Sequence, residues 1–106
     1  MTVQIACGHS RGRARSSATG LQILHGKPSF VEYKTASGTS QPTTAAAPDL
    51  GEDVGVWDIV NAGSAAVWVT FAASPTAAAG TTWLIPAGSG RSFAATPGDK
   101  CAVINA

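Results

Sequence analysis

Residues 56–71 read VWDIVNAGSAAVWVTF, two short apolar runs on either side of a cluster of turn-forming residues. The runs at 56–60 and 66–71 are rich in β-branched and aromatic residues, which favour strands. The asparagine, glycine and serine at 61–64 favour a turn. Two such runs with a glycine-containing turn between them are typical of a β-hairpin, so this stretch predicts two paired antiparallel strands.

The same pattern extends along most of the chain. Pro/Gly turns at 86–90 and 96–99 separate further short apolar runs, and no segment has a sustained helical period. The other candidate strands are 2–6, 21–24, 30–34, 82–85, 91–95 and 100–104. Short strands between such turns predict an all-β fold, either a small antiparallel β-sandwich or a jelly-roll-like barrel.

The chain has 106 residues, enough for one domain. We divide it into an N-terminal strand and extended basic arm, residues 1–20, and a single β domain, residues 21–106. Within that domain, residues 36–53 are rich in alanine, threonine and proline and are expected to form an internal loop.

The basic arm contains Arg11, Arg13 and Arg15, separated by single small residues. Arginines at this spacing can contact phosphates or a carboxylate-rich protein surface. No aromatic side chain is interleaved for base stacking, so the pattern disfavours nucleic acid as the partner. We expect the arm either to stay solvated or to dock on an acidic protein surface.

Three tryptophans fall within candidate strands, and the strands that carry them are apolar on both faces. A half-exposed sandwich normally has polar residues on its outer face, so either a loop or another subunit must cover this one. Only 12% of the residues are charged, which favours a protein packed against neighbours. We therefore assign Trp57, Trp68 and Trp83 to a subunit interface of a homo-oligomer.

No pattern in the sequence indicates an enzyme, a metal site or a cofactor. Neither His9 nor His25 has an acidic neighbour, and Cys7 with His9 supplies only two of the three or four ligands that zinc needs. The N-terminus lacks the apolar core of a signal peptide, and no apolar run approaches the roughly 20 residues of a membrane span. We expect a protein made in the cytoplasm, with no membrane partner.

Cys7 directly follows the first candidate strand, and Cys101 lies in the last one. If those strands paired, the two sulfurs would come within bridging reach. Three arrangements are compatible with the sequence: two buried free thiols, a disulfide within the chain, or a disulfide between subunits.

The order of motifs resembles a group of small structural proteins of tailed bacteriophages. The resemblance covers residues 54–106 and is carried by Asn61-Ala62-Gly63 before Val67-Trp68-Val69-Thr70-Phe71, then Ser74-Pro75, Ile85-Pro86-Ala87-Gly88 and a final strand after Pro97-Gly98. Ala72 stands where those proteins commonly have glycine.

The resemblance implies a β-sandwich that resides in the virion, as a capsid decoration (cement) protein on the outer surface of the head shell. Its partners would be the major capsid protein and further copies of itself, which we expect to form trimers. The alternatives are a tail, neck or fibre/spike component, or a host-surface module that binds carbohydrate.

Overall fold

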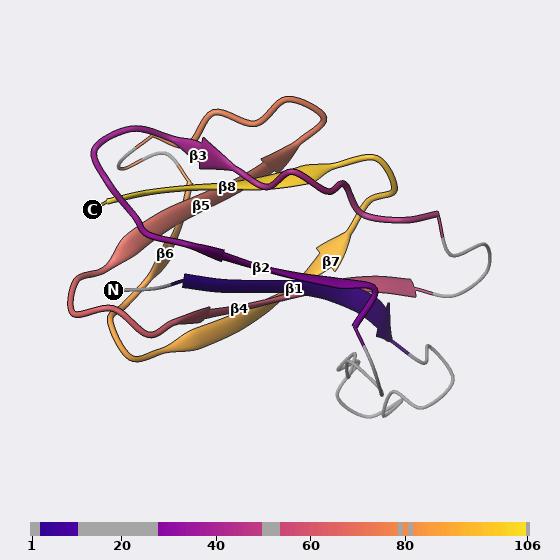
Figure 1. Cartoon of the computed structure of the whole chain (residues 1–106), viewed down its shortest axis with the longest axis horizontal. Helices are drawn as coiled ribbons and strands as arrows, with labels where there is room; N and C mark the ends of the chain where they lie inside the picture. The colour runs from indigo at the N-terminus through magenta and orange to yellow at the C-terminus, as the bar shows by residue number, and fades with distance from the viewer. Residues whose placement is uncertain (1–2, 11–27, 50–53, 79, 81, 106) are drawn as a thin grey trace.

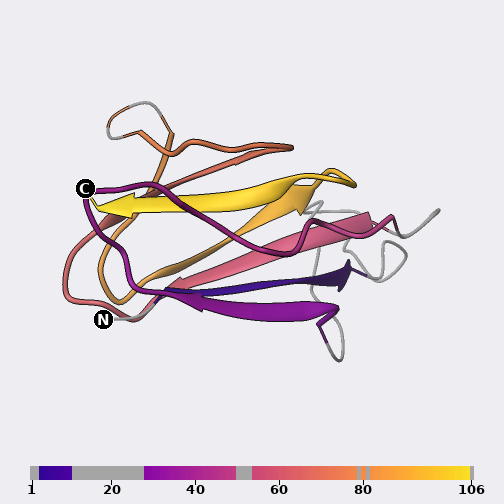
Figure 2. The same ribbon diagram turned by 45° about the horizontal axis from the view of Figure 1, so that its top comes forward.

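The computed structural model describes residues 3–10, 28–49, 54–78, 80 and 82–105. These residues form eight strands and no helix. The strands are β1 (Val3–Ser10), β2 (Phe30–Lys34), β3 (Gln41–Pro42), β4 (Val54–Asn61), β5 (Val67–Ala72), β6 (Trp83–Ile85), β7 (Gly90–Ala95) and β8 (Lys100–Asn105). Two antiparallel four-stranded sheets, in the orders β2-β1-β4-β7 and β3-β8-β5-β6, face each other (Figures 1 and 2). The predicted all-β sandwich is confirmed.

The strand pairs are nested along the chain. β5 pairs with β6, β4 with β7, and β3 with β8, so each pair encloses the previous one. Successive pairs lie in alternate sheets. One long antiparallel ribbon thus wraps around itself, which is the arrangement of a jelly roll. β1 completes the first sheet by pairing with both β2 and β4.

The hairpin predicted for residues 56–71 is wrong. β4 and β5 are both strands, but β4 lies in the first sheet and β5 in the second. The 62–66 segment between them crosses from one sheet to the other instead of reversing within a sheet. The connections β6–β7 and β7–β8 cross in the same way, as Figure 1 shows.

Two of these crossings have the geometry of a type II turn. The Asp99 N–H donates to the Thr96 oxygen, and the Ser89 N–H donates to the Pro86 oxygen, both at 3.1 Å. The third residue of each turn is a glycine with positive φ, 88° at Gly98 and 74° at Gly88. A type II turn requires positive φ at this position, and glycine adopts it without steric cost.

The Asn61 side chain holds the β4–β5 crossing in place. Its Nδ2 donates to the Ala65 oxygen at 2.8 Å and to the Ile85 oxygen at 3.1 Å, and its Oδ1 accepts from the Gly63 N–H at 3.0 Å. The side chain is fully buried. One buried amide therefore shapes its own turn and ties it to the end of β6.

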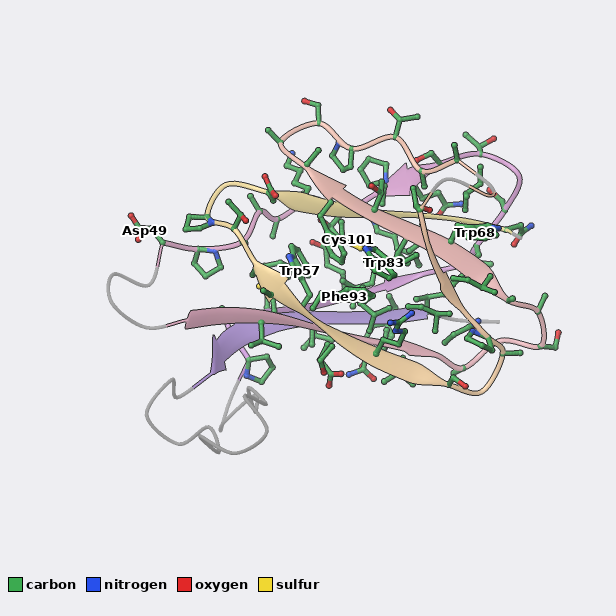
Figure 3. All side chains as sticks on the ribbon, turned by 180° about the vertical axis from the view of Figure 1, so that it is seen from behind. Asp49, Trp57, Trp68, Trp83, Phe93 and Cys101 are labelled. Carbon is green, nitrogen blue, oxygen red and sulfur yellow. The ribbon has the colours of Figure 1, made fainter. Side chains whose placement is uncertain are left out.

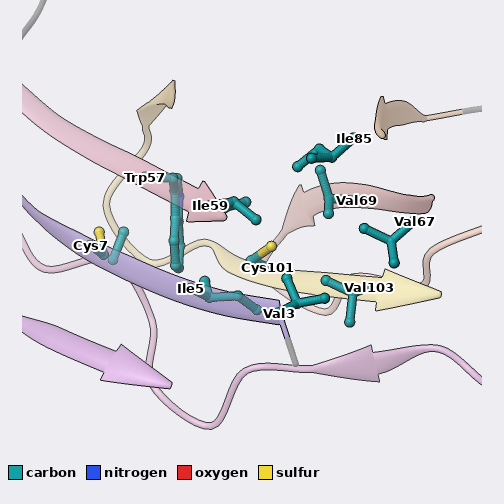
Figure 4. Packing of buried hydrophobic residues seen from close by; sticks show 11 residues of the cluster. Val3, Ile5, Cys7, Trp57, Ile59, Val67, Val69, Ile85, Cys101 and Val103 are labelled. Atoms are coloured by element: carbon teal, nitrogen blue, oxygen red, sulfur yellow. The ribbon is translucent and has the colours of Figure 1, made fainter. Parts of the chain in front are cut away.

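The core fills the space between the sheets (Figure 4). Alternate residues of each strand point inward, as the period of two requires. The inward residues that form the core are Val3, Ile5, Cys7, Trp57, Ile59, Val67, Val69, Ile85, Cys101 and Val103, with Ala47 from the connection between β3 and β4.

The sequence analysis placed the N-terminal strand with the arm in residues 1–20, apart from the β domain. In the structure, β1 belongs to the same sandwich as the other strands. β1 is an interior strand of the first sheet, and it contributes three core residues. The expected 36–53 loop also has a structural role, since it carries β3 and two buried residues, Thr43 and Ala47. The Thr43 Oγ1 accepts from the Cys101 N–H at 3.1 Å and donates to the Ala45 oxygen at 2.9 Å. This connection therefore anchors β8 as well as linking the sheets.

Candidate functional site

Trp57 belongs to the core and not to a subunit interface. Its side chain, labelled in Figure 3, is 0% exposed. Its ring centroid lies 5.5 Å from those of both Phe30 and Phe71. The interface assignment is wrong for this residue, because Trp57 and Ile59 form the inward face of β4. Its Nε1 is buried, and none of the described residues accepts a hydrogen bond from it.

Trp68 lies on the outer face of the second sheet. It alternates with the buried Val67 and Val69, and its cross-strand neighbours are Leu84 and Ile104. The side chain is half-buried. Part of the chain itself runs beside β5 here: the connection that follows β5 doubles back along the strand in Figures 1 and 2.

Two residues of that connection, Pro75 and Ala77, are buried. The Ala77 N–H donates to the Ser40 Oγ at 2.8 Å, which ties the connection to the residue before β3. The sequence analysis left two possible covers for an apolar outer face, a loop of the chain or another subunit. Beside β5, a loop of the chain is present. Trp68 remains a predicted contact residue.

Trp83 lies where an edge of one sheet comes close to an edge of the other, a place we call the seam. β6 is the edge strand of one sheet and β7 is the edge strand of the other. The Trp83 ring lies 6.0 Å from the Phe93 ring, and the Arg91 guanidinium lies over both rings, 5.1 Å and 5.6 Å from their centroids. Trp83 is nevertheless 54% exposed. We call Trp83, Arg91 and Phe93 the seam patch.

Sequence reasoning missed Arg91 and Phe93 as members of this patch. Both are separated from Trp83 by the 86–89 turn, which suggests a simple hairpin. The turn instead carries the chain to the opposite sheet, so the three side chains meet across the gap between sheets.

The outer face of the first sheet also exposes apolar side chains. On the outer side of the first sheet, Tyr33 is 65% exposed, and Val31 and Val60 are both partly exposed. Gln4 lies between Tyr33 and Val60 in the pairing of β2, β1 and β4. This face carries few charges, so it offers apolar contact area and little electrostatic selectivity.

The described residues hold no cluster of metal-ligating side chains. Within the part of the chain that the structure describes, no three His, Cys, Asp or Glu side chains gather to hold a metal ion. A pocket of about 260 Å³ opens beside Asn61, Ser64 and Asn105. The Asn61 amide already donates to the Ala65 and Ile85 oxygens and accepts from the Gly63 N–H, so it offers this pocket no free donor.

Cys7 and Cys101 are free thiols in the core. The condition for a bridge, pairing of the first and last strands, is not met, because β1 and β8 belong to different sheets. Burial raises the pKa of the Cys7 thiol to about 11 and that of Cys101 to about 12. Both thiols therefore stay protonated at neutral pH and act as small apolar core residues.

Glu32 and Lys34 point inward from the edge strand β2, and the Glu32 carboxylate binds the connection beside β3. Its two oxygens accept from the N–H groups of Thr44, at 2.9 Å, and Ala45, at 2.8 Å, while the Lys34 Nζ lies 3.4 Å away. Desolvation alone would raise the pKa of Glu32. The hydrogen bonds from Ala45 and Thr44, together with Lys34, outweigh desolvation and lower the pKa below its usual value.

This lowered pKa predicts a loss of stability in acid. A carboxyl group with a lower pKa in the folded state stabilises the fold above its unfolded pKa of about 4.3, and the contribution disappears as pH falls through the folded pKa. Urea unfolding can be measured at a series of pH values from about 7 to about 3. At neutral pH, Glu32→Gln should have a lower free energy of unfolding than the wild type, and in acid the two values should converge. Parallel pH profiles would contradict the role given to this carboxylate.

The remaining predicted site residues, Arg11, Arg13 and Arg15, lie outside the described residues, as does the candidate strand at 21–24. In the described part of the chain, no helix has the length and apolar character needed to cross a membrane.

Comparisons with protein-family models, with curated proteins and with solved structures found no match to this chain.

Proposed function

We propose that this protein is a structural component of a tailed bacteriophage, a decoration protein that binds the outer surface of the capsid shell. The observation that carries the proposal is the combination of exposed apolar side chains and a low content of charge. Tyr33 and Trp83 are more than half exposed, on a chain in which only 12% of residues are charged. Such a surface suits permanent contact with neighbouring subunits.

The resemblance to phage structural proteins supports the same function. Its motif residues form the crossings of the jelly roll: Asn61 and Gly63 before β5, Gly88 before β7, and Gly98 before β8. The resemblance therefore lies in residues that determine the fold. In this proposal the major capsid protein is the partner, Arg11, Arg13 and Arg15 contact an acidic part of the shell, and the protein forms trimers.

Reconstitution tests the proposal. Purified protein should co-sediment with capsid shells that lack it and reach a fixed number of copies per shell. The triple substitution of Arg11, Arg13 and Arg15 by alanine should weaken attachment and leave the unfolding transition unchanged. Binding to isolated tails and not to shells would overturn the capsid location.

One observation favours a second candidate, a host-surface module that binds carbohydrate. An exposed tryptophan can stack on a sugar ring, and Trp83 is 54% exposed. However, the Arg91 guanidinium already lies 5.1 Å from the centroid of that ring. A sugar would have to displace Arg91 or use the other face of the ring, so this candidate ranks second.

A further inference from the structure

The two sheets have four edge strands, and three of them are poorly suited to accept another strand. β3 has two residues, one of which is Pro42, and β6 has three residues and is followed by Pro86. β2 carries the inward-pointing charges of Glu32 and Lys34, and the Glu32 carboxylate is bonded to the neighbouring connection. Short strands, proline and inward-pointing charges are the usual protections of a sheet edge.

β7 is neither short nor interrupted by proline, and its one inward-pointing charge, Arg91, lies over the Trp83 and Phe93 rings. It has six residues, Gly90-Arg91-Ser92-Phe93-Ala94-Ala95, with no proline and a single charge. Three of its first four residues are exposed. On one side it pairs with β4, and among the described residues no strand pairs with its other side.

The hydrogen bonds at the start of β7 show which backbone groups face that open side. The Asn61 N–H donates to the Ser89 oxygen at 2.8 Å, and the Asn61 oxygen accepts from the Gly88 N–H at 2.8 Å, so the backbone groups of Asn61 point to the start of β7. Bonded and non-bonded pairs alternate along an antiparallel ladder. The backbone groups of Arg91, Phe93 and Ala95 therefore point to β4, and those of Gly90, Ser92 and Ala94 point away from it.

A strand added at this edge would lie next to the seam patch. Its inward side chains would face Phe93 and Trp83, which are apolar, and Arg91. Its outward side chains would lie beside Ser92 and Ala94, which are small and exposed. Among the described residues Arg91 contacts the two rings and has no carboxylate partner. A complementary strand would thus place apolar side chains on its inner face, with one carboxylate opposite Arg91.

We propose that β7 is a docking edge for an extended segment of another protein, with apolar side chains at alternate positions and an acidic residue that pairs with Arg91. This mode of recognition adds a strand to the sheet through backbone hydrogen bonds, and side chains supply specificity. The β7 of a second copy fits less well, because its only charged residue is another Arg91 and it supplies no carboxylate. The inference concerns the chain by itself and does not depend on the capsid location.

Titration with a synthetic peptide tests this inference. The probe is a short capped peptide in which threonine alternates with valine, with glutamate in place of the central valine. Amide hydrogen exchange of the wild-type protein, followed by NMR, should slow by about tenfold at Ser92 and Ala94 when the peptide is present. The amides of β6 should be unaffected. Protection elsewhere, or no protection at millimolar peptide, would overturn the proposal.

Matched variants locate the contact. Ser92→Pro removes an N–H that points away from β4, so it should weaken peptide binding by about tenfold while β4 pairing persists. Ser92→Ala keeps that N–H and should bind as the wild type does. Arg91→Gln should weaken binding of the glutamate peptide and leave a glutamine version unaffected. Equal binding by Ser92→Pro and Ser92→Ala, with both shown to be folded by circular dichroism, would refute strand addition.

Sedimentation of the protein without peptide tests whether a second copy of the chain occupies the β7 edge instead. A monomeric state, or an oligomer in which the Ser92 and Ala94 amides still exchange freely, agrees with the proposal. An oligomer that protects those two amides would show that a second copy occupies the edge, and it would overturn the assignment to another protein.

Discussion

Replacing Asn61 with aspartate should destabilise the fold by at least about 3 kcal/mol, a shift of roughly 10–25 °C in Tm. The Asn61 Nδ2 donates to two oxygens, those of Ala65 and Ile85. A carboxylate in its place donates nothing, and it would bring a buried negative charge against those oxygens. Thermal and urea unfolding, followed by circular dichroism, measure the effect.

Asn105→Asp is the matched control for this prediction. It makes the same chemical change at an exposed position at the end of β8. Exposed substitutions generally change stability by less than about 0.5 kcal/mol. If both variants unfolded at the same denaturant concentration, the Asn61 amide would not be what holds the β4–β5 crossing.

Replacing Trp57 with alanine should cost roughly 3–5 kcal/mol, the usual range for a buried aromatic side chain. The ring packs between Phe30 and Phe71, and its removal leaves a cavity at the centre of the core. Loss of the Nε1 donor breaks no hydrogen bond within the described part of the chain, so it adds no penalty there. Urea unfolding of the purified variant measures the loss.

Trp83→Ala is the comparison that separates a core role from a surface role. Trp83 is 54% exposed, so its loss should cost about 1 kcal/mol, mainly from the contact with Phe93. A Trp57→Ala protein with normal stability but an altered oligomeric state would contradict the core position of Trp57. It would support the interface assignment made from sequence.

Local sequence patterns predicted most strands, because strand propensity and turn residues act over a few neighbouring positions. They could not predict which strands pair. Asn61 and Gly63 specify a reversal of the chain, but a turn within a sheet and a crossing between sheets use the same residue types. The difference depends on contacts distant in sequence, such as the bond from Asn61 to the Ile85 oxygen.

The same limit applies to the tryptophans. Alternation along β4 places Trp57 and Ile59 on one of its two faces. It could not tell which face is buried, because both are apolar. The neighbouring strands determine which face is buried. Ile59 and Trp57 lie opposite Ile5 and Cys7 of β1, which also face the core.

The seam patch could not be predicted at all from local patterns. It exists because β6 and β7 are consecutive in the chain yet form edges of opposite sheets. Only the nested order of the ribbon brings Trp83 beside Arg91 and Phe93. Binding surfaces that depend on topology in this way are visible only when the pairing of strands is known.

Cryo-electron microscopy of capsid shells, with and without the purified protein, tests the proposed function most directly. A difference map should contain density on the outer surface of the shell, at local three-fold positions, into which the two four-stranded sheets fit. Shells that remain bare at saturating protein would contradict the assignment to the capsid surface. Density confined to the neck or tail would contradict it as well.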